Sequence, residues 1–121
     1  MANPSTTGPS GAGTEVIRRF TANGVNDTYT NLTVPADHIY TLLCLNIIDY
    51  ESIGNATNSI LFGFSPDGSG DCWLVADQSI NGRETFVYNE KVCFTEGDII
   101  KIHCDSTNHD VMLTYIDQQF A

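Results

Sequence analysis

The sequence contains few basic residues. Five lysines and arginines are set against fifteen aspartates and glutamates, which gives a formal net charge of −10. Proteins that bind nucleic acid neutralise phosphates with clustered Lys and Arg. The adjacent pair Arg18 and Arg19 would point to opposite faces of a strand. Anionic membrane surfaces repel such a chain for the same electrostatic reason. We therefore expect neither nucleic acid nor a membrane as a partner.

Helical patterns and long apolar runs are missing as well. No apolar run approaches the roughly 18–20 residues of a membrane span, and no stretch keeps the i, i+3, i+4, i+7 spacing of an amphipathic helix. Charged residues are only 17% of the chain while hydrophobic residues are 41%. This profile is typical of a β-rich protein. A chain of 121 residues is long enough for one domain with a single core.

Residue patterns that carry catalysis or bind metal are also scarce. The three histidines include no His-x-His pair that could ligate one metal from a strand, and His103 and Cys104 would point to opposite faces. The alternating oxygens of 67–71 resemble a calcium loop, but Cys72 and Gln78 occupy the positions that need Gly and Glu. No Gly-x-Ser-x-Gly or Gly-x-Gly-x-x-Gly motif occurs. We expect a protein that is not an enzyme and that holds no metal or cofactor.

Four cysteines, Cys44, Cys72, Cys93 and Cys104, could form two disulfides in three pairings. No charged and apolar leader of the secretory type precedes the domain, so we expect synthesis in a cytoplasm. Cys44, Cys93 and Cys104 also lie within apolar strand patterns, where a free cysteine behaves as a small buried hydrophobe. The sequence therefore favours four reduced thiols.

From Thr14 onward the chain alternates short β-type segments with turn signals. The turns are at Asn23-Gly24, Pro35–Asp37 and 95–98, with a hairpin signal at Asn81-Gly82. Gly97 takes the turn position that needs a positive φ. Regularly spaced short strands predict an all-β fold, a single antiparallel β-sandwich or jelly-roll-like domain over 14–121. The expected strands are 14–22, 27–34, 38–50, 58–65, 72–78, 83–89, 91–94, 99–105 and 110–120.

The first thirteen residues form a separate segment of Pro, Ser, Thr and Gly without charge. Such a composition cannot order itself, and we expect a flexible N-terminal arm over 1–13. Two interpretations remain open, a frayed terminus or an arm that orders on a neighbouring subunit. In the second case Pro4, Thr6 and Pro9 are candidate contacts.

The segment Val34–Glu51 is apolar on both faces of the expected strand. Strict alternation places one set on one side (Ile39, Leu43, Leu45 and Ile47) and another set on the opposite side (Tyr40, Leu42, Cys44 and Ile48). One side is needed for the core, so the other predicts a second dry surface, with Tyr40, Leu42 and Ile48 as interface residues of a homo-oligomer. The alternative is a central strand covered by the protein's own arm or loops.

Two segments resemble small virion proteins of tailed bacteriophages. NLTVPADHIYTLLCLNI is similar to a strand pair joined by a Val-Pro-Ala-Gly-Lys-like turn, and VCFTEGDIIKIHCDSTNHDVMLTYID to an acidic-Gly-Asp turn with a closing hairpin. Asp37 and His38 stand where Gly and Lys are common in these proteins, so any role of that lysine does not carry over. Head decoration (cement) proteins and small tail-accessory proteins share this layout.

The resemblance implies a non-enzymatic decoration protein on the capsid surface of a virion. It would bind the major capsid protein, stabilise the head and form a homo-trimer or homo-dimer. An alternative from a different class is a receptor- or glycan-binding module of a tail fibre, with Trp73 and the loop 65–71 as its site.

Thiol chemistry tests the cytoplasmic interpretation. A thiol titration of the denatured protein, prepared without oxidant, should count four free thiols, and metal analysis should find less than a stoichiometric amount. Two or fewer thiols would contradict the expectation that the cysteines are reduced.

Overall fold

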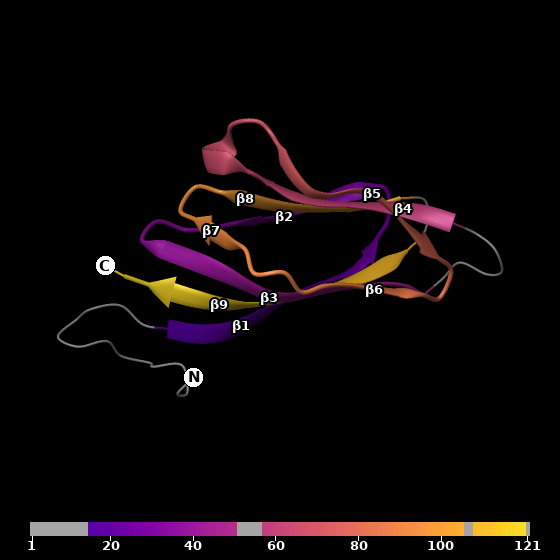
Figure 1. Ribbon diagram of the computed structural model, residues 1–121, viewed down its shortest axis with the longest axis horizontal. Coiled ribbons are helices and arrows are strands. Elements are labelled where there is room, and N and C mark those ends of the chain that lie inside the picture. The colour runs from indigo at the N-terminus through magenta and orange to yellow at the C-terminus, as the bar shows by residue number, and fades with distance from the viewer. Residues whose placement is uncertain (1–14, 51–56, 106–107, 121) are drawn as a thin grey trace.

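Two antiparallel sheets pack face to face, one above the other in Figure 1. The structure is a computed structural model that describes residues 15–50, 57–105 and 108–120. Sheet A has the order β1-β9-β3-β6, with β7 also beside β3, and sheet B has the order β2-β8-β4-β5. The strands are β1 (Glu15–Val25), β2 (Thr28–Thr33), β3 (His38–Asp49), β4 (Thr57–Ser65), β5 (Cys72–Asn81), β6 (Thr85–Tyr88), β7 (Cys93–Thr95), β8 (Ile99–Cys104) and β9 (His109–Gln119). A 3₁₀ turn, η2 (Pro66–Gly68), joins β4 to β5.

Strands β6 and β7 together occupy one position beside β3. β7 pairs with Ile39–Thr41, and β6 pairs with Leu45–Ile48 further along the same strand. Counted as one strand, they give two four-stranded sheets between which the chain crosses repeatedly, with the first strand beside the last. This is the strand order of a jelly roll, which confirms the predicted fold class. No helix in the described part of the chain is long and apolar enough to cross a membrane.

A β-bulge in β3 changes which residues face the core. The pairing with β9 shifts between Leu42 and Cys44, so the alternation is reset in the middle of the strand. Before the bulge Tyr40 and Leu42 are buried; after it Leu45 and Ile47 are buried. Strict alternation had placed these pairs on opposite faces. Tyr40 and Leu42, expected at an interface, therefore belong to the core, whereas Ile48 is exposed as expected.

Two predicted turns have a different role in the structure. β1 continues through Asn23 and Gly24, where Gly24 has φ +62° and the register with β9 shifts, so this site is a bulge. The chain crosses to sheet B after it, at Asp27, which also has a positive φ. The Asn81-Gly82 signal does mark a turn, but β5 and β6 belong to different sheets, so no hairpin forms. Turn residues such as Asn-Gly predict where the chain reverses direction, but they do not predict which strands pair.

The Thr95–Asp98 turn is as predicted, and it joins the two sheets. Gly97 has φ +85°, a conformation that favours glycine. The Asp98 carboxylate accepts hydrogen bonds from the backbone N–H of Thr95 (2.8 Å) and of Asp67 (3.1 Å). The backbone of Val34 pairs with the same turn, donating to the Asp98 carbonyl at 2.9 Å and accepting from the N–H of Gly97 at 3.0 Å. One buried aspartate thus holds the β7–β8 crossing and the η2 loop together.

The core lies between the sheets and consists of the inward residues of both. Phe62 of β4 is fully buried and contacts Tyr88 of β6 edge to face, with ring centroids 5.4 Å apart. Phe94 of β7 meets Phe64 in the same way at 5.3 Å. Other buried members are Val25, Val34, Leu42, Leu45, Ile47, Ile60, Ile80, Ile100, Ile102, Cys104, Val111 and Leu113. Truncating a buried aromatic of this kind to Ala costs about 3–5 kcal/mol of stability.

Gly63 of β4 allows β5 to approach closely. A Cβ at this position would lie 2.3 Å from the carbonyl oxygen of Cys72 and 2.9 Å from the Cα of Trp73. Both atoms are backbone, so neither can rotate away. We expect Gly63→Ala to force β4 and β5 apart at a cost of about 1–3 kcal/mol, which thermal unfolding would show as a lower Tm.

Gly68→Ala is the matched control for this substitution. Gly68 has φ +72° with no atom within 4 Å of the added Cβ, so Ala there has backbone strain alone, about 1–2 kcal/mol. Gly63 is not one of the glycines with a positive φ, so the destabilisation expected for Gly63→Ala comes from the steric clash with β5. If Gly63→Ala unfolded at the wild-type temperature, the close approach of β5 would be wrong.

Candidate functional site

The outer face of sheet A carries little charge and combines apolar side chains with threonines and two amides. The register pairs outward residues across four strands, for example Ile17 with Ile116 and Asn46 with both Met112 and Val87. In β3, β7 and β9 these residues alternate with buried neighbours, and the register carries the same outward direction to β1 and β6. We define the outer face of sheet A by Ile17, Thr21, Ile39, Thr41, Cys44, Asn46, Ile48, Thr85, Val87, Cys93, Thr95, Met112, Thr114, Ile116 and Gln118.

Charges are confined to the margin of this face. Glu15 and Arg19 lie on the outward side of the edge strand β1, and Asp110 lies near the start of β9. The outward positions of β3, β6 and β7 carry no charged side chain. An antiparallel sheet with one wet face normally alternates hydrophobic-in with polar-out residues. The uncharged outward positions of β3, β6 and β7, several of them apolar, depart from that pattern.

Several large apolar side chains on the outer face of sheet A are exposed to solvent. Val87 is 52% exposed, Ile17 is 45% exposed and Ile48 is 37% exposed, while Ile39, Met112 and Ile116 are half-buried. At one end the face is hollowed by a cavity of about 270 Å³. Its lining residues are Thr21, Asn23, Asn46, Ile48, Thr85, Asp110, Val111 and Met112. A partner side chain could insert there, next to Ile48.

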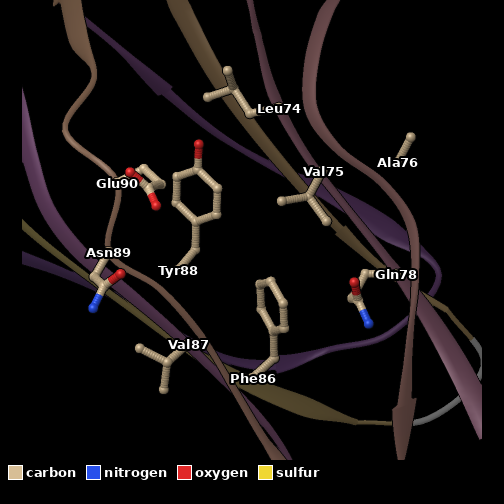
Figure 2. Close-up of a pocket in the computed structure, with 9 residues that line it drawn as sticks. All are labelled: Leu74, Val75, Ala76, Gln78, Phe86, Val87, Tyr88, Asn89 and Glu90. Atoms are coloured by element: carbon tan, nitrogen blue, oxygen red, sulfur yellow. The ribbon is translucent and has the colours of Figure 1, made fainter.

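A second hollow, of about 460 Å³, lies between the two sheets at their open edge (Figure 2). Phe86 and Tyr88 of β6 extend toward Leu74 and Val75 of β5, while Val87 points away from them. The other lining residues are Ala76, Gln78, Asn89 and Glu90. Because β5 and β6 are each the last strand of their sheet, the two sheets are not closed by hydrogen bonds here. The hollow is the place where the core opens to solvent between the two sheets, and it does not bring reactive side chains together.

The buried titratable groups form structural networks. Asp117 of β9 accepts from the Nε of Arg18 at 2.7 Å and contacts the Nδ1 of His38 at 2.5 Å. Beside it, burial and the neighbouring Tyr115 raise the pKa of Tyr40 to about 12. Burial likewise raises the pKa of Tyr115. Both phenols therefore stay protonated at neutral pH, and neither is an activated nucleophile.

A second network lies in the interior and offers no access to a substrate. The Nδ2 of Asn58 donates to the Oδ2 of Asp49 at 2.7 Å, and the Nε2 of His109 lies 3.8 Å from the same oxygen. Burial, with the Asp49 charge as a smaller cause, raises the pKa of Cys104 to about 12. Asp49 and His109 have no exposed surface. This network joins β3, β4 and β9 inside the sandwich.

The cysteines and histidines of the described residues do not form a common cluster. All four cysteines are free; Cys104 is buried and Cys44 half-buried, but Cys93 is exposed, so the expectation of a buried Cys93 is wrong. Cys93 instead lies on the outer face of sheet A, 3.6 Å from the Oγ1 of Thr41. His103 points outward and Cys104 inward, as predicted for adjacent strand residues. Among the described residues, no group of three His, Cys, Asp or Glu side chains could hold a metal ion.

The candidate interface residues are therefore separated by the structure. Pro4, Thr6 and Pro9 lie outside the described residues. Ile48 lies on the outer face of sheet A, whereas Tyr40 and Leu42 do not. Sequence reasoning missed Ile17, Val87, Met112 and Ile116. The signal was present in β9, which is apolar on both sides: Val111, Leu113 and Tyr115 alternate with Met112 and Ile116.

No protein-family model and no curated protein matches this sequence. Among solved structures, the chain is similar to a protein of Bacillus endospore appendages, described as a family of disulfide-linked pili. The TM-score is 0.46 at 10% identity, and the likeness covers 94% of this chain and 95% of the other.

The chain is also similar to part of the N-terminal CBM22-1–GH10 modules of xylanase 10B from Clostridium thermocellum, whose structure contains xylohexaose. The TM-score is 0.40 at 14% identity, and the likeness covers 98% of this chain but only 24% of that one. At these values neither likeness states what this chain does.

Proposed function

We propose that this protein is a non-enzymatic virion protein that decorates and stabilises the head of a tailed bacteriophage, docking through the outer face of sheet A. The single observation that carries the docking surface is the uncharged outward side of β3, β6 and β7, next to the apolar Met112 and Ile116 of β9. The resemblance of 31–50 and 92–117 to small virion proteins supplies the kind of partner, the major capsid protein.

Desolvation favours this face over the rest of the surface. A chain with a net charge of −10 must strip water from charged groups almost anywhere else it makes contact. At the outer face of sheet A, binding removes apolar side chains and threonines from water, which is worth about 25 cal/mol per Å² of apolar area. Association through the outer face of sheet A therefore desolvates few charged groups.

The size of the face is sufficient for a specific contact. Four strands about 4.8 Å apart and some eleven residues at about 3.3 Å give an area on the order of 700 Å². Stable protein interfaces bury roughly 800 Å² per partner. A small decoration protein could therefore be held at each lattice site by this face alone, and any ordering of residues 1–13 would add to it.

A rigid sandwich also suits a stabilising role. The face is built on paired strands rather than on loops, so little conformational entropy is lost when it docks. β3 lies at its centre and pairs with β9 on one side and with β6 and β7 on the other. A force exerted by a partner on Ile48 or Met112 is therefore transmitted through the hydrogen bonds between strands to the rest of sheet A.

The test introduces a charge into the outer face of sheet A at Val87, whose partner across β3 is the uncharged Asn46. Val87→Lys should leave the fold intact, because the side chain is already 52% exposed. A buried, unpaired ammonium should weaken binding to heads assembled without the protein by at least tenfold, about 1.4 kcal/mol. Bound copies per head, counted by sedimentation with undecorated heads, give the measurement.

Thr33→Lys, an exposed and outward position of sheet B, makes the same charge change on the other sheet and is the control. It should bind as the wild type does. Equal occupancy for both variants would contradict docking through sheet A. Failure of the wild-type protein to bind heads would contradict the decoration role itself. If Val87→Lys instead converted a wild-type oligomer to a 13.2 kDa monomer while head binding remained, the face would join copies of this chain.

A further inference from the structure

The outer face of sheet B differs in chemistry from that of sheet A. Its register aligns Tyr29 with His103 and Leu61 in one row, and Asn31 with Lys101, Gly63 and Trp73 in the next. The residues between them on β4 and β8, including Phe62 and Ile102, are buried, so both rows point outward. Aromatic rings and polar groups are therefore gathered on one face.

Tyr29 and Trp73 approach each other from opposite edges of the sheet. β2 and β5 are three strand spacings apart, about 14 Å, yet the two ring centroids are only 6.3 Å apart and the ring planes differ by 24°. Gly63 makes this possible, because a Cβ there would lie 2.7 Å from the Cε3 of Trp73. The imidazole of His103 supports Tyr29 from the side, with centroids 4.8 Å apart.

Hydrogen-bonding groups surround these rings. The Nζ of Lys101 lies 2.8 Å from the Oδ1 of Asp71 and 6.0 Å from the centre of the Tyr29 ring. The Nε2 of His103 lies 3.5 Å from the Oδ1 of Asp27. Asp71 is the last residue of the loop between η2 and β5. Through Lys101 this loop therefore lies next to the ring of Tyr29 on β2.

We propose that Tyr29 and Trp73 form a binding site for a neutral saccharide on the outer face of sheet B. A pyranose ring has a flat apolar C–H face and a rim of hydroxyls. The nearly parallel rings present flat apolar surface to the first, and the neighbouring amino, carboxylate and imidazole groups can exchange hydrogen bonds with the second. Tyr29 is 50% exposed in the protein, so a ligand would remove a large wet aromatic surface from water.

Charge selects among ligands that stack on aromatic rings. Nucleic-acid bases also stack, but such sites need a positively charged groove to hold the phosphates. Here Lys101 is matched by Asp71 and His103 by Asp27, and the whole chain carries a charge of −10. Nucleic acids and anionic polysaccharides are therefore repelled, and a neutral sugar chain fits.

The site lies on the opposite sheet from the docking face, so both could be occupied at once. The saccharide site does not rest on the proposed decoration function, because a different set of residues carries it.

Trp73 is the only tryptophan, so intrinsic tryptophan fluorescence reports directly on this site. We expect a saturable change in its emission on titration of the full-length protein with at least one of cellohexaose, maltohexaose and chitohexaose. Hexagalacturonate, the anionic probe, should produce none. No response to any neutral probe up to 10 mM, or a response to hexagalacturonate alone, would overturn the proposal.

Substitutions localise the binding. Tyr29→Ala should weaken the affinity for the responding sugar at least tenfold. Tyr50→Ala is the matched control, because Tyr50 is exposed to a similar degree (45%) and takes no part in the described ring contacts with Trp73; its affinity should be unchanged. Trp73→Ala, followed by calorimetry because the reporter is lost, should abolish binding. Unchanged affinity in Tyr29→Ala, with the variant still folded by circular dichroism, would overturn the assignment.

Discussion

The bulge in β3 between Leu42 and Cys44 is the constraint on which the arrangement of sheet A depends. β3 pairs with β9 along one side and with β6 and β7 along the other, so its register sets theirs. Without the bulge, a core containing Tyr40 and Leu42 would turn Leu45 and Ile47 toward water, because a shift of one residue exchanges the faces of a strand. With it, both pairs are buried, and Ile39 and Ile48 share the outer face.

The two outer faces then acquire different properties from the same scaffold. Sheet A presents branched aliphatic side chains and threonines, and removing these side chains from water costs little free energy. Sheet B presents two aromatic rings within hydrogen-bonding groups, which suit a ligand that is apolar on one side and polar at its rim. The buried carboxylates of Asp49, Asp98 and Asp117 each tie segments together from within the sandwich.

The sequence was sufficient for the fold class, because short alternating segments and turn residues are local signals. The same signals do not state which sheet a strand joins: Asn81-Gly82 was recognised as a turn, but the pairing of β5 with β4 depends on contacts across the whole sandwich. The interface residues were partly misplaced because alternation assumes an uninterrupted pleat, and a bulge in a uniformly apolar segment such as TLLCL leaves no mark in the sequence. The meeting of Tyr29 and Trp73 could not be anticipated, since these residues are far apart in the chain and are brought together by Gly63.

The edge strands have a consequence for how copies of the protein can associate. β1 contains the bulge at Gly24 and β5 contains register shifts and Asp77 in a positive φ, while β2 and β6 are only six and four residues long. Short edges, and edges interrupted by bulges, are poor templates for pairing with a neighbouring chain. Edge-to-edge growth of sheets is therefore disfavoured along β2, β5 and β6, where contacts between molecules are left to side-chain surfaces.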